Sequence, residues 1–356
     1  MTSDRPSILL KDERQITNRL VRWGHARDGD DRETGAECFH DETTVQIVSV
    51  TRIERQGNIE NALLILVCAI TLLLIPGCLN NRFYQPNQIL YKTPDQYNLR
   101  YEEVFFKSKD GTKLHGWFIP AVGDAVGTVI HFHGNFGNLT YYFNQIGWLP
   151  LINFNVFTFD YRGYGQSEGA PSRHGIYEDS VSAIEHIISK PTIASGNVYI
   201  FGQSLGGVNA IVAIAKNNFP EIRAIAIEGA FYSYRAEARD MMGATVQKKI
   251  GNIPGLSLQT WLFSLLSVTN SYSPDEFIDQ VSPIPILLIH CTQDSVVSYH
   301  HSERLHEKAK EPKHLWIISG CSHLQAFTDK KTEYRYRQRL VQFFNDHRQS
   351  MRGGSF

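Results

Sequence analysis

The segment Gly202-Gln203-Ser204-Leu205-Gly206 places a serine between two glycines at the spacing G-x-S-x-G. An apolar, strand-like segment precedes it and a helix-like segment follows it. In that context the motif is typical of a sharp turn that lifts the serine hydroxyl above a sheet. The pattern therefore predicts Ser204 as the nucleophile of an acyl transfer, which needs a general base within hydrogen-bonding distance. A turn in which Ser204 only caps the helix is the alternative, but a cap does not require glycine on both sides.

Strand-like and helix-like segments alternate from residue 81 onward. Two strands come first, and the turn signal Asp110-Gly111 joins them. The strands are expected at 101–107, 113–120, 128–133, 155–160, 197–201, 222–227, 284–290 and 315–318. Helices are expected between the later strands at 176–189, 207–216 and 299–308, and after the last strand at 332–347. This order predicts an α/β fold with a mainly parallel, doubly wound sheet and an N-terminal antiparallel hairpin.

Three motifs together resemble those of the α/β-hydrolase superfamily. They are the serine turn, the run HFHGNFGN at 131–138 and the run DYRGYG at 160–165. The resemblance covers roughly residues 101–347, and the chain looks most like membrane-anchored serine hydrolases with a His-Gly-Asn oxyanion loop. It implies the α/β-hydrolase fold, the chain order serine, acid, histidine, and a reaction that needs neither a metal nor an organic cofactor.

Candidate partners for the serine stand where that chain order requires them. Asp294 comes shortly after a late apolar strand, and His323 follows the last strand. Both loops leave the carboxyl edge of the sheet, where Ser204 is also expected and where ligands bind in open α/β sheets. We therefore expect His323 to act as general base and Asp294 to orient its imidazole. Glu228, at the end of the preceding strand, is the rival acid.

An oxyanion hole needs two backbone N–H donors in addition to these side chains. One is expected from Leu205, directly after the nucleophile. By resemblance to the His-Gly-X pattern, the second comes from Asn135, with Phe136 as the next choice. His133 is expected to order this loop without touching the substrate.

About fifty residues, 231–283, stand where a single crossover would be enough. Helix-like segments at 241–249 and 258–268, separated by Gly-Asn and Pro-Gly breaks, predict a helical lid. Its aromatic side chains either line an apolar acyl pocket or form the packed face of the lid, and the sequence leaves both readings open. These side chains are Phe231, Tyr232, Tyr234, Trp261 and Phe263.

The five cysteines form no CxxC pair and no HExxH motif is present, so neither a zinc site nor a thioredoxin-like motif is supported. Cys291 and Cys321 lie just past adjacent strands. We expect both to be reduced, half-buried thiols. A disulfide between the two catalytic loops is the alternative, and export from the cytoplasm would favour it.

The N-terminal part is expected to precede the enzyme domain. Residues 1–61 are polar and are predicted to be a disordered extension or a mis-assigned start. Residues 62–75 (ALLILVCAITLLLI) carry no charge, and their number suits a signal peptide better than a membrane span of about 20 residues. Cys78 follows in a sequence that resembles the lipobox of bacterial lipoproteins, although Pro76 is unusual there. We therefore predict a signal or anchor segment at 62–78 and the hydrolase domain at 79–350.

Composition narrows the possible partners and functions. The formal net charge is −1 with no long run of Lys or Arg, which argues against nucleic-acid binding. We expect a small acyl substrate and a bacterial envelope location, by a lipidated Cys78 or a single N-terminal anchor. The triad predicts cleavage of a carboxylic ester or thioester through an acyl-serine. A serine peptidase of the same fold and a non-catalytic, membrane-tethered binding protein are the alternatives.

Overall fold

The computed structural model describes residues 83–190, 196–250 and 256–349. The predicted polar extension at 1–61 and the predicted signal or anchor segment at 62–78 lie outside these residues, and their boundaries stay predictions. Within the described ranges, no helix combines the length and apolar character that crossing a bilayer requires.

A single eight-stranded sheet organises the domain, with the strand order β10-β9-β8-β7-β4-β6-β3-β2. Its strands are β2 (Glu102–Lys107), β3 (Lys113–Ile119), β4 (Gly127–Phe132), β6 (Phe154–Phe159), β7 (Val198–Gln203), β8 (Ile222–Glu228), β9 (Ile286–Cys291) and β10 (Lys313–Ile318). β3 runs antiparallel to both β2 and β6, and the other neighbours are parallel. The predicted α/β-hydrolase fold, with an antiparallel hairpin before a mainly parallel sheet, is confirmed.

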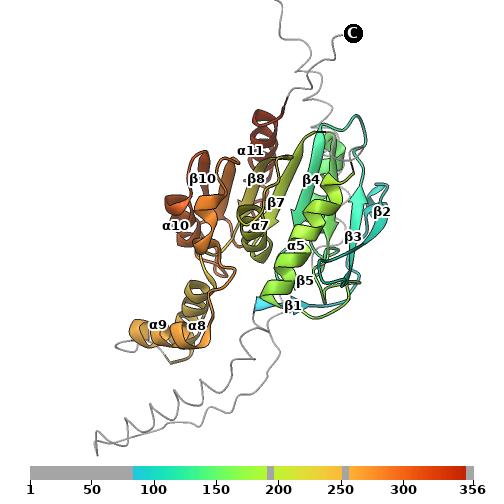
Figure 1. The fold of residues 1–356 in the computed structure, drawn as a ribbon. Coiled ribbons are helices and arrows are strands. Elements are labelled where there is room, and N and C mark those ends of the chain that lie inside the picture. The colour runs from blue at the N-terminus through green and yellow to red at the C-terminus, as the bar shows by residue number, and fades with distance from the viewer. Residues whose placement is uncertain (1–82, 191–195, 251–255, 350–356) are drawn as a thin grey trace, which may run out of the picture. The chain divides into compact units, whose positions relative to one another are not determined.

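Helices cover both faces of this sheet (Figure 1). The helices of the described ranges are α4 (Phe143–Ile146), α5 (Arg173–Ile188), α7 (Leu205–Ala215), α8 (Tyr234–Ile250), α9 (Leu256–Ser267), α10 (His300–Lys308) and α11 (Glu333–Asp346), of which α8 and α9 form a separate pair away from the sheet. Side chains alternate along β7, so that Ile200 joins the apolar core with α5 and α7, whereas the Tyr199 ring packs 4.8 Å from that of Phe344 in α11. Because both faces are covered, β4, β6, β7 and β9 are buried along their whole length, which explains their mainly apolar sequences.

Short elements complete the described part of the chain. They are the parallel pair β1 (Gln85–Pro86) and β5 (Phe136–Gly137), and the 3-10 helices η1 (Pro94–Tyr97), η2 (Leu149–Ile152), η3 (Pro274–Glu276) and η4 (Ile278–Gln280). The sequence analysis predicted none of them, because two- to four-residue elements carry too little periodicity to be recognised.

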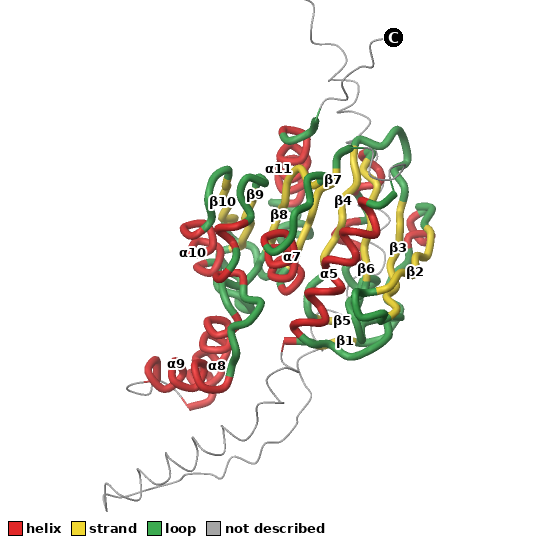
Figure 2. The backbone as a smooth tube through the Cα atoms, in the orientation of Figure 1, coloured by secondary structure: helices red, strands yellow, loops and turns green. Residues whose placement is uncertain are grey.

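The insertion at 231–283 contains the helix pair α8–α9, whose members pack against each other (Figure 2). Phe231 and Tyr234, at its beginning, are buried, and their rings lie 6.0 and 5.0 Å from that of Phe83. These two aromatics therefore form a packed face of the insertion and do not line an open acyl pocket. Trp261, in contrast, is largely exposed.

Candidate active site

Ser204 occupies the turn between β7 and α7 with φ 51° and ψ −122°, a conformation that L-residues other than glycine rarely adopt. Its N–H donates to the carbonyl of Glu228 at 2.7 Å, which fixes the turn against β8. A Cβ added at Gly202 would lie 2.8 Å from the Cα of Gly207. A Cβ added at Gly206 would lie 2.0 Å from the carbonyl oxygen of Phe132, at the end of β4. The motif therefore needs glycine at both positions because neighbouring backbone occupies the space of a side chain.

Three side chains that lie far apart in the sequence meet at the carboxyl edge of the sheet. His323 Nε2 lies 3.1 Å from Ser204 Oγ, and His323 Nδ1 lies 2.6 Å from Asp294 Oδ2. The imidazole keeps 16% of its surface exposed, whereas the Asp294 carboxylate keeps 1%. The hydroxyl of Ser204 thus contacts the imidazole of His323, which in turn contacts the carboxylate of Asp294.

The Asp294 carboxylate is held by four donors. Oδ1 accepts from the backbone N–H groups of Val296 and Val297 at 2.9 and 2.8 Å, and Oδ2 contacts His323 and His290. Burial by itself would raise the pKa of Asp294, but the hydrogen bonds from His290 and His323, the charge of His323 and the Val297 N–H hold that pKa well below its usual range. The carboxylate is therefore ionised at neutral pH and can keep the hydrogen of His323 on Nδ1.

His290 is a partner of the carboxylate that the sequence analysis did not predict. Its Nε2 lies 3.1 Å from Asp294 Oδ2 and 2.9 Å from the carbonyl oxygen of Val297, so the hydrogen is assigned to Nε2, which faces two acceptors. Its Nδ1 lies 2.7 Å from the Ser302 hydroxyl. The signal that could have revealed it is a histidine in the apolar strand β9, four residues before Asp294.

Glu228, the rival acid, belongs to a separate buried network under the serine turn. Its Oε2 accepts from Gln203 Nε2 at 2.7 Å and from the Tyr336 hydroxyl at 2.8 Å, while its Oε1 is buried without a hydrogen-bond partner. Gln203 Oε1 in turn lies 3.0 Å from His131 Nε2, and burial lowers the pKa of His131 to about 3. Burial also raises the pKa of Glu228. The structure therefore brings Asp294, and not Glu228, into hydrogen-bonding contact with His323.

Asn135 lies in the loop that follows β4. Its carbonyl oxygen accepts from the N–H of Gln85 at 3.1 Å and from the Tyr164 hydroxyl at 2.9 Å. The next residue, Phe136, uses its backbone in a hydrogen bond to the Tyr142 hydroxyl. Asn135 as the second oxyanion donor, with Phe136 as the next choice, stays a prediction.

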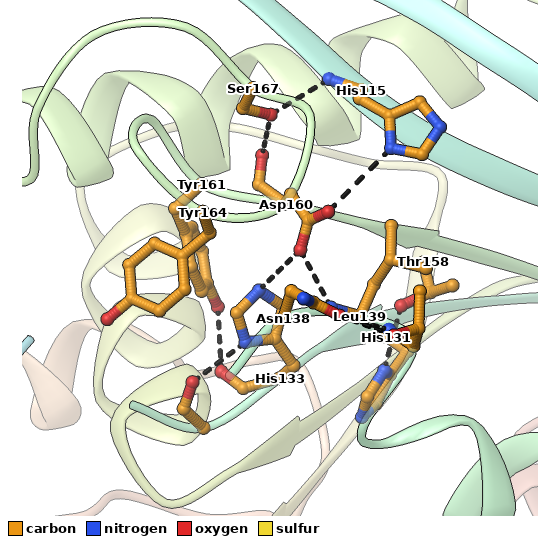
Figure 3. A network of polar contacts seen from close by, with 12 residues as sticks. His115, His131, His133, Asn138, Leu139, Thr158, Asp160, Tyr161, Tyr164 and Ser167 are labelled. Carbon is orange, nitrogen blue, oxygen red and sulfur yellow. Dashed lines mark hydrogen bonds and ion pairs between the residues drawn. The ribbon is translucent and has the colours of Figure 1, made fainter. Parts of the chain in front are cut away.

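The buried carboxylate of Asp160 contacts the segment that follows β4 (Figure 3). Asp160 Oδ1 accepts from the N–H of Leu139 at 2.7 Å and lies 3.4 Å from His133 Nε2, and its Oδ2 lies 3.7 Å from His115 Nδ1. Burial by itself would raise the pKa of Asp160, but its contacts with His115, His133 and the Leu139 N–H lower it. His133 Nδ1 contacts the carbonyl oxygen of Gly134 at 2.7 Å. His133 therefore orders the loop through backbone and carboxylate contacts.

Cys291 and Cys321 form a disulfide with their Cα atoms 5.1 Å apart, so the expectation of two reduced, half-buried thiols is wrong. Both residues are almost fully buried. Ile318 pairs with Cys291 across β9 and β10, and the chain turns back after β10, which brings Cys321 within bonding distance. The bond joins the loops of Asp294 and His323, and closing a segment of this length stabilises the fold by about 3–4 kcal/mol in the chain-entropy model.

Glu237, in the first turn of α8, is a buried carboxyl group near the site. Burial, and then the charges of Asp240 and Asp294, raise its pKa to about 8. The pKa of Glu237 is higher in the folded protein than in the unfolded chain. The protonated carboxyl group therefore stabilises the fold fully below about pH 4.5, and this stabilisation is lost as the pH rises through about 8. We expect Glu237→Gln to gain stability relative to the wild type across this window. Denaturant unfolding at a series of pH values tests this, with exposed Glu307→Gln as the control; a constant difference between Glu237→Gln and wild type would contradict it.

Sequence comparison places the chain among hydrolases. Residues 123–282 match the family described as serine aminopeptidase, S33. The chain is 39% identical over 284 residues to the uncharacterized protein YfhR of Escherichia coli, with 79% of this chain and 92% of that protein covered. It is 27% identical to alpha/beta hydrolase domain-containing protein 17B of Homo sapiens, with 67% of this chain and 73% of that protein covered.

Solved structures with the same fold include an esterase from Pyrococcus furiosus. Its TM-score is 0.60 at 21% identity, with 75% of this chain and 99% of the esterase covered. An acylaminoacyl peptidase from Pyrococcus horikoshii has a TM-score of 0.53 at 17% identity, with 72% of this chain and 43% of the peptidase covered. At these identities the likeness shows the fold alone. Within the part of the chain that the structure describes, no group of three or more His, Cys, Asp or Glu side chains is arranged to hold a metal ion.

Proposed function

Because the chain belongs to the α/β-hydrolase superfamily, we propose that it is a serine hydrolase that cleaves a carboxylic ester, thioester or related acyl substrate through an acyl-serine intermediate. The observation that carries this proposal is the continuous contact from Ser204 Oγ to His323 at 3.1 Å and from His323 to Asp294 at 2.6 Å. The strained backbone at Ser204 supports it further, because strain of this kind persists where it serves a function.

These contacts support a specific donor and acceptor for each proton transfer. Asp294 holds the Nδ1–H of His323, which leaves Nε2 as the acceptor for the Ser204 proton as Oγ attacks the substrate carbonyl. The N–H groups of Leu205 and Asn135 stabilise the oxyanion that forms. His323 Nε2–H then protonates the leaving group, and a water molecule repeats the sequence to release the acid. Asp294 stays ionised throughout and stabilises the imidazolium.

The N-terminal segment supports a membrane location. The uncharged run 62–75 and Cys78 are consistent with a single N-terminal anchor or a lipidated cysteine of a bacterial envelope protein. Either attachment would hold the site near lipids, which would favour acyl substrates located in the membrane.

A serine peptidase is the second candidate. The match of residues 123–282 to serine aminopeptidase, S33, favours it, because the same triad cleaves esters and amides. A non-catalytic binding protein is disfavoured, since Ser204, His323 and Asp294 are all present and in contact.

A fluorophosphonate probe tests the proposal directly. We expect the probe to label the wild type at one site and not to label Ser204→Ala. A series of chromogenic esters of increasing acyl length, measured beside a panel of aminopeptidase substrates, then separates esterase from peptidase. Absence of labelling and turnover in the folded wild type would favour the non-catalytic reading.

A further inference from the structure

Helix α9 turns apolar side chains to the solvent and polar side chains to the protein. Leu258, Trp261, Leu262 and Leu265 are between 40% and 60% exposed, and their spacing i, i+3, i+4, i+7 places them on one stripe. Thr260 and Ser264, one turn apart on another side, are buried. A helix in contact with water has the opposite arrangement, so the exposed stripe of α9 is suited to an apolar surrounding.

The described chain begins beside this helix pair. The Phe83 ring lies 5.0 Å from the ring of Tyr234, the first residue of α8, and the Tyr84 and Tyr234 hydroxyls are 3.4 Å apart. Only seven residues, 76–82, separate the apolar run 62–75 from Phe83. Fully extended, this connection spans at most about 29 Å. A bilayer that takes up the run 62–75 is therefore within reach of α8 and α9.

A basic hollow adjoins the apolar stripe. It measures about 300 Å³, and Trp261 and Leu265 of the stripe line it together with Arg235, Arg239 and Arg304. The Arg304 guanidinium lies 3.8 Å from the centre of the Tyr232 ring, in stacking contact. Asp275 is the one carboxylate among the lining side chains of the hollow, and Asp240 pairs with Arg239 at 3.4 Å, so three guanidinium groups stand against two carboxylates. Guanidinium groups next to an apolar stripe suit the phosphate of a lipid head group.

We propose that the α8–α9 pair docks on the surface of an anionic phospholipid bilayer. The stripe Leu258, Trp261, Leu262 and Leu265 enters the boundary between head groups and acyl chains, where a tryptophan ring is favourable. The arginines of the hollow contact lipid phosphate. Since α8 begins at Tyr234, six residues after β8 ends at the carboxyl edge, docking of α8 and α9 brings the edge that carries Ser204 near the lipid.

Short-range quenching of Trp261 by brominated lipid tests the proposal with the full chain. The protein is reconstituted in phosphatidylcholine and phosphatidylglycerol vesicles with or without brominated acyl chains, and the emission of Trp261 is the difference between wild type and Trp261→Phe. We expect brominated lipid to remove most of this difference. Leu258→Glu/Leu262→Glu should lower the quenched fraction about tenfold, because each leucine loses its apolar burial. The matched control Val122→Glu, an equally exposed apolar position before β4, should leave it unchanged.

Two further measurements distinguish an anionic bilayer from other partners of the apolar stripe. Arg239→Gln/Arg304→Gln should weaken docking about tenfold in anionic vesicles and not in pure phosphatidylcholine. Thermal unfolding confirms that each variant is folded, independently of any activity. If the chain floats with the vesicles but Trp261 keeps its full emission, or if the stripe is covered by a second copy of the chain, the proposal is overturned. The same holds if the wild type does not associate with vesicles at all.

Discussion

Replacing Asp294 by Asn is expected to lower kcat by about 10⁴-fold while the fold is retained. The reason is the tautomer of His323. The Asp294 carboxylate accepts the Nδ1–H at 2.6 Å, whereas an asparagine amide can present a donor there. The imidazole would then carry its hydrogen on Nε2, and it could no longer accept the proton of Ser204. The measurement is kcat for the best ester of the substrate series, with the rate of fluorophosphonate labelling as a second readout.

Glu228→Gln is the matched control for this prediction. Glu228 hydrogen-bonds Gln203 and Tyr336 and shares no hydrogen bond with His323, so we expect kcat to stay within about tenfold of the wild type. Both substitutions exchange one carboxylate oxygen for an NH2 group. A difference in kcat between the two variants therefore depends on which carboxylate is replaced and not on the kind of replacement. A large loss of kcat in Glu228→Gln together with a small loss of kcat in Asp294→Asn would identify Glu228 as the acid of the triad.

Replacing Gly206 by Ala is expected to have the second large effect. A Cβ at this position would lie 2.0 Å from the carbonyl oxygen of Phe132 and 2.4 Å from that of His133. Both atoms are backbone, so the serine turn itself must move away from β4. We expect a loss of about 3 kcal/mol or more in the free energy of unfolding, since overpacking against rigid backbone is not easily relieved. A shift of Ser204 by about 1 Å would also lower kcat about hundredfold.

Gly243→Ala provides the comparison at a helical glycine with free space. Nothing lies within 4 Å of a Cβ added at Gly243, which is in α8. Alanine there should raise the free energy of unfolding by about 0.5–1 kcal/mol, because it restricts the unfolded chain and favours the helix. Denaturant unfolding of both variants is the measurement. Equal stability of Gly206→Ala and the wild type would show that the turn is not packed against β4.

The local features of the site could be read from the sequence because neighbours in the chain create them. The glycines around Ser204 indicate a turn in which side chains do not fit, and they lie within two residues of the serine. Apolar runs such as that of β7 reveal strands buried on both faces. The loops of Asp294 and His323 follow from the position of those strands in the chain, since parallel strands end at the same edge.

Contacts between distant segments needed the tertiary structure. Glu228 and Asp294 follow adjacent strands, and only the path of each loop decides that Asp294 meets His323 whereas Glu228 meets Tyr336. The second histidine at Asp294, His290, depends on the same loop. The disulfide also depends on the tertiary structure, because the register of β9 and β10 and the turn after β10 bring Cys291 and Cys321 together.

The orientation of α9 shows the limit of sequence patterns most clearly. Leucines occur on every turn of the segment LSLQTWLFSLLS, so its periodicity does not say which side faces the protein. Packing with α8 buries Thr260 and Ser264 and leaves Trp261 outside. The sequence by itself determined the fold, the serine turn and the order of the candidate triad, because these depend on residues close in the chain or on the order of strands. The tertiary structure alone decided the partners of each side chain and the exposed face of α9, because these depend on where separate segments pack.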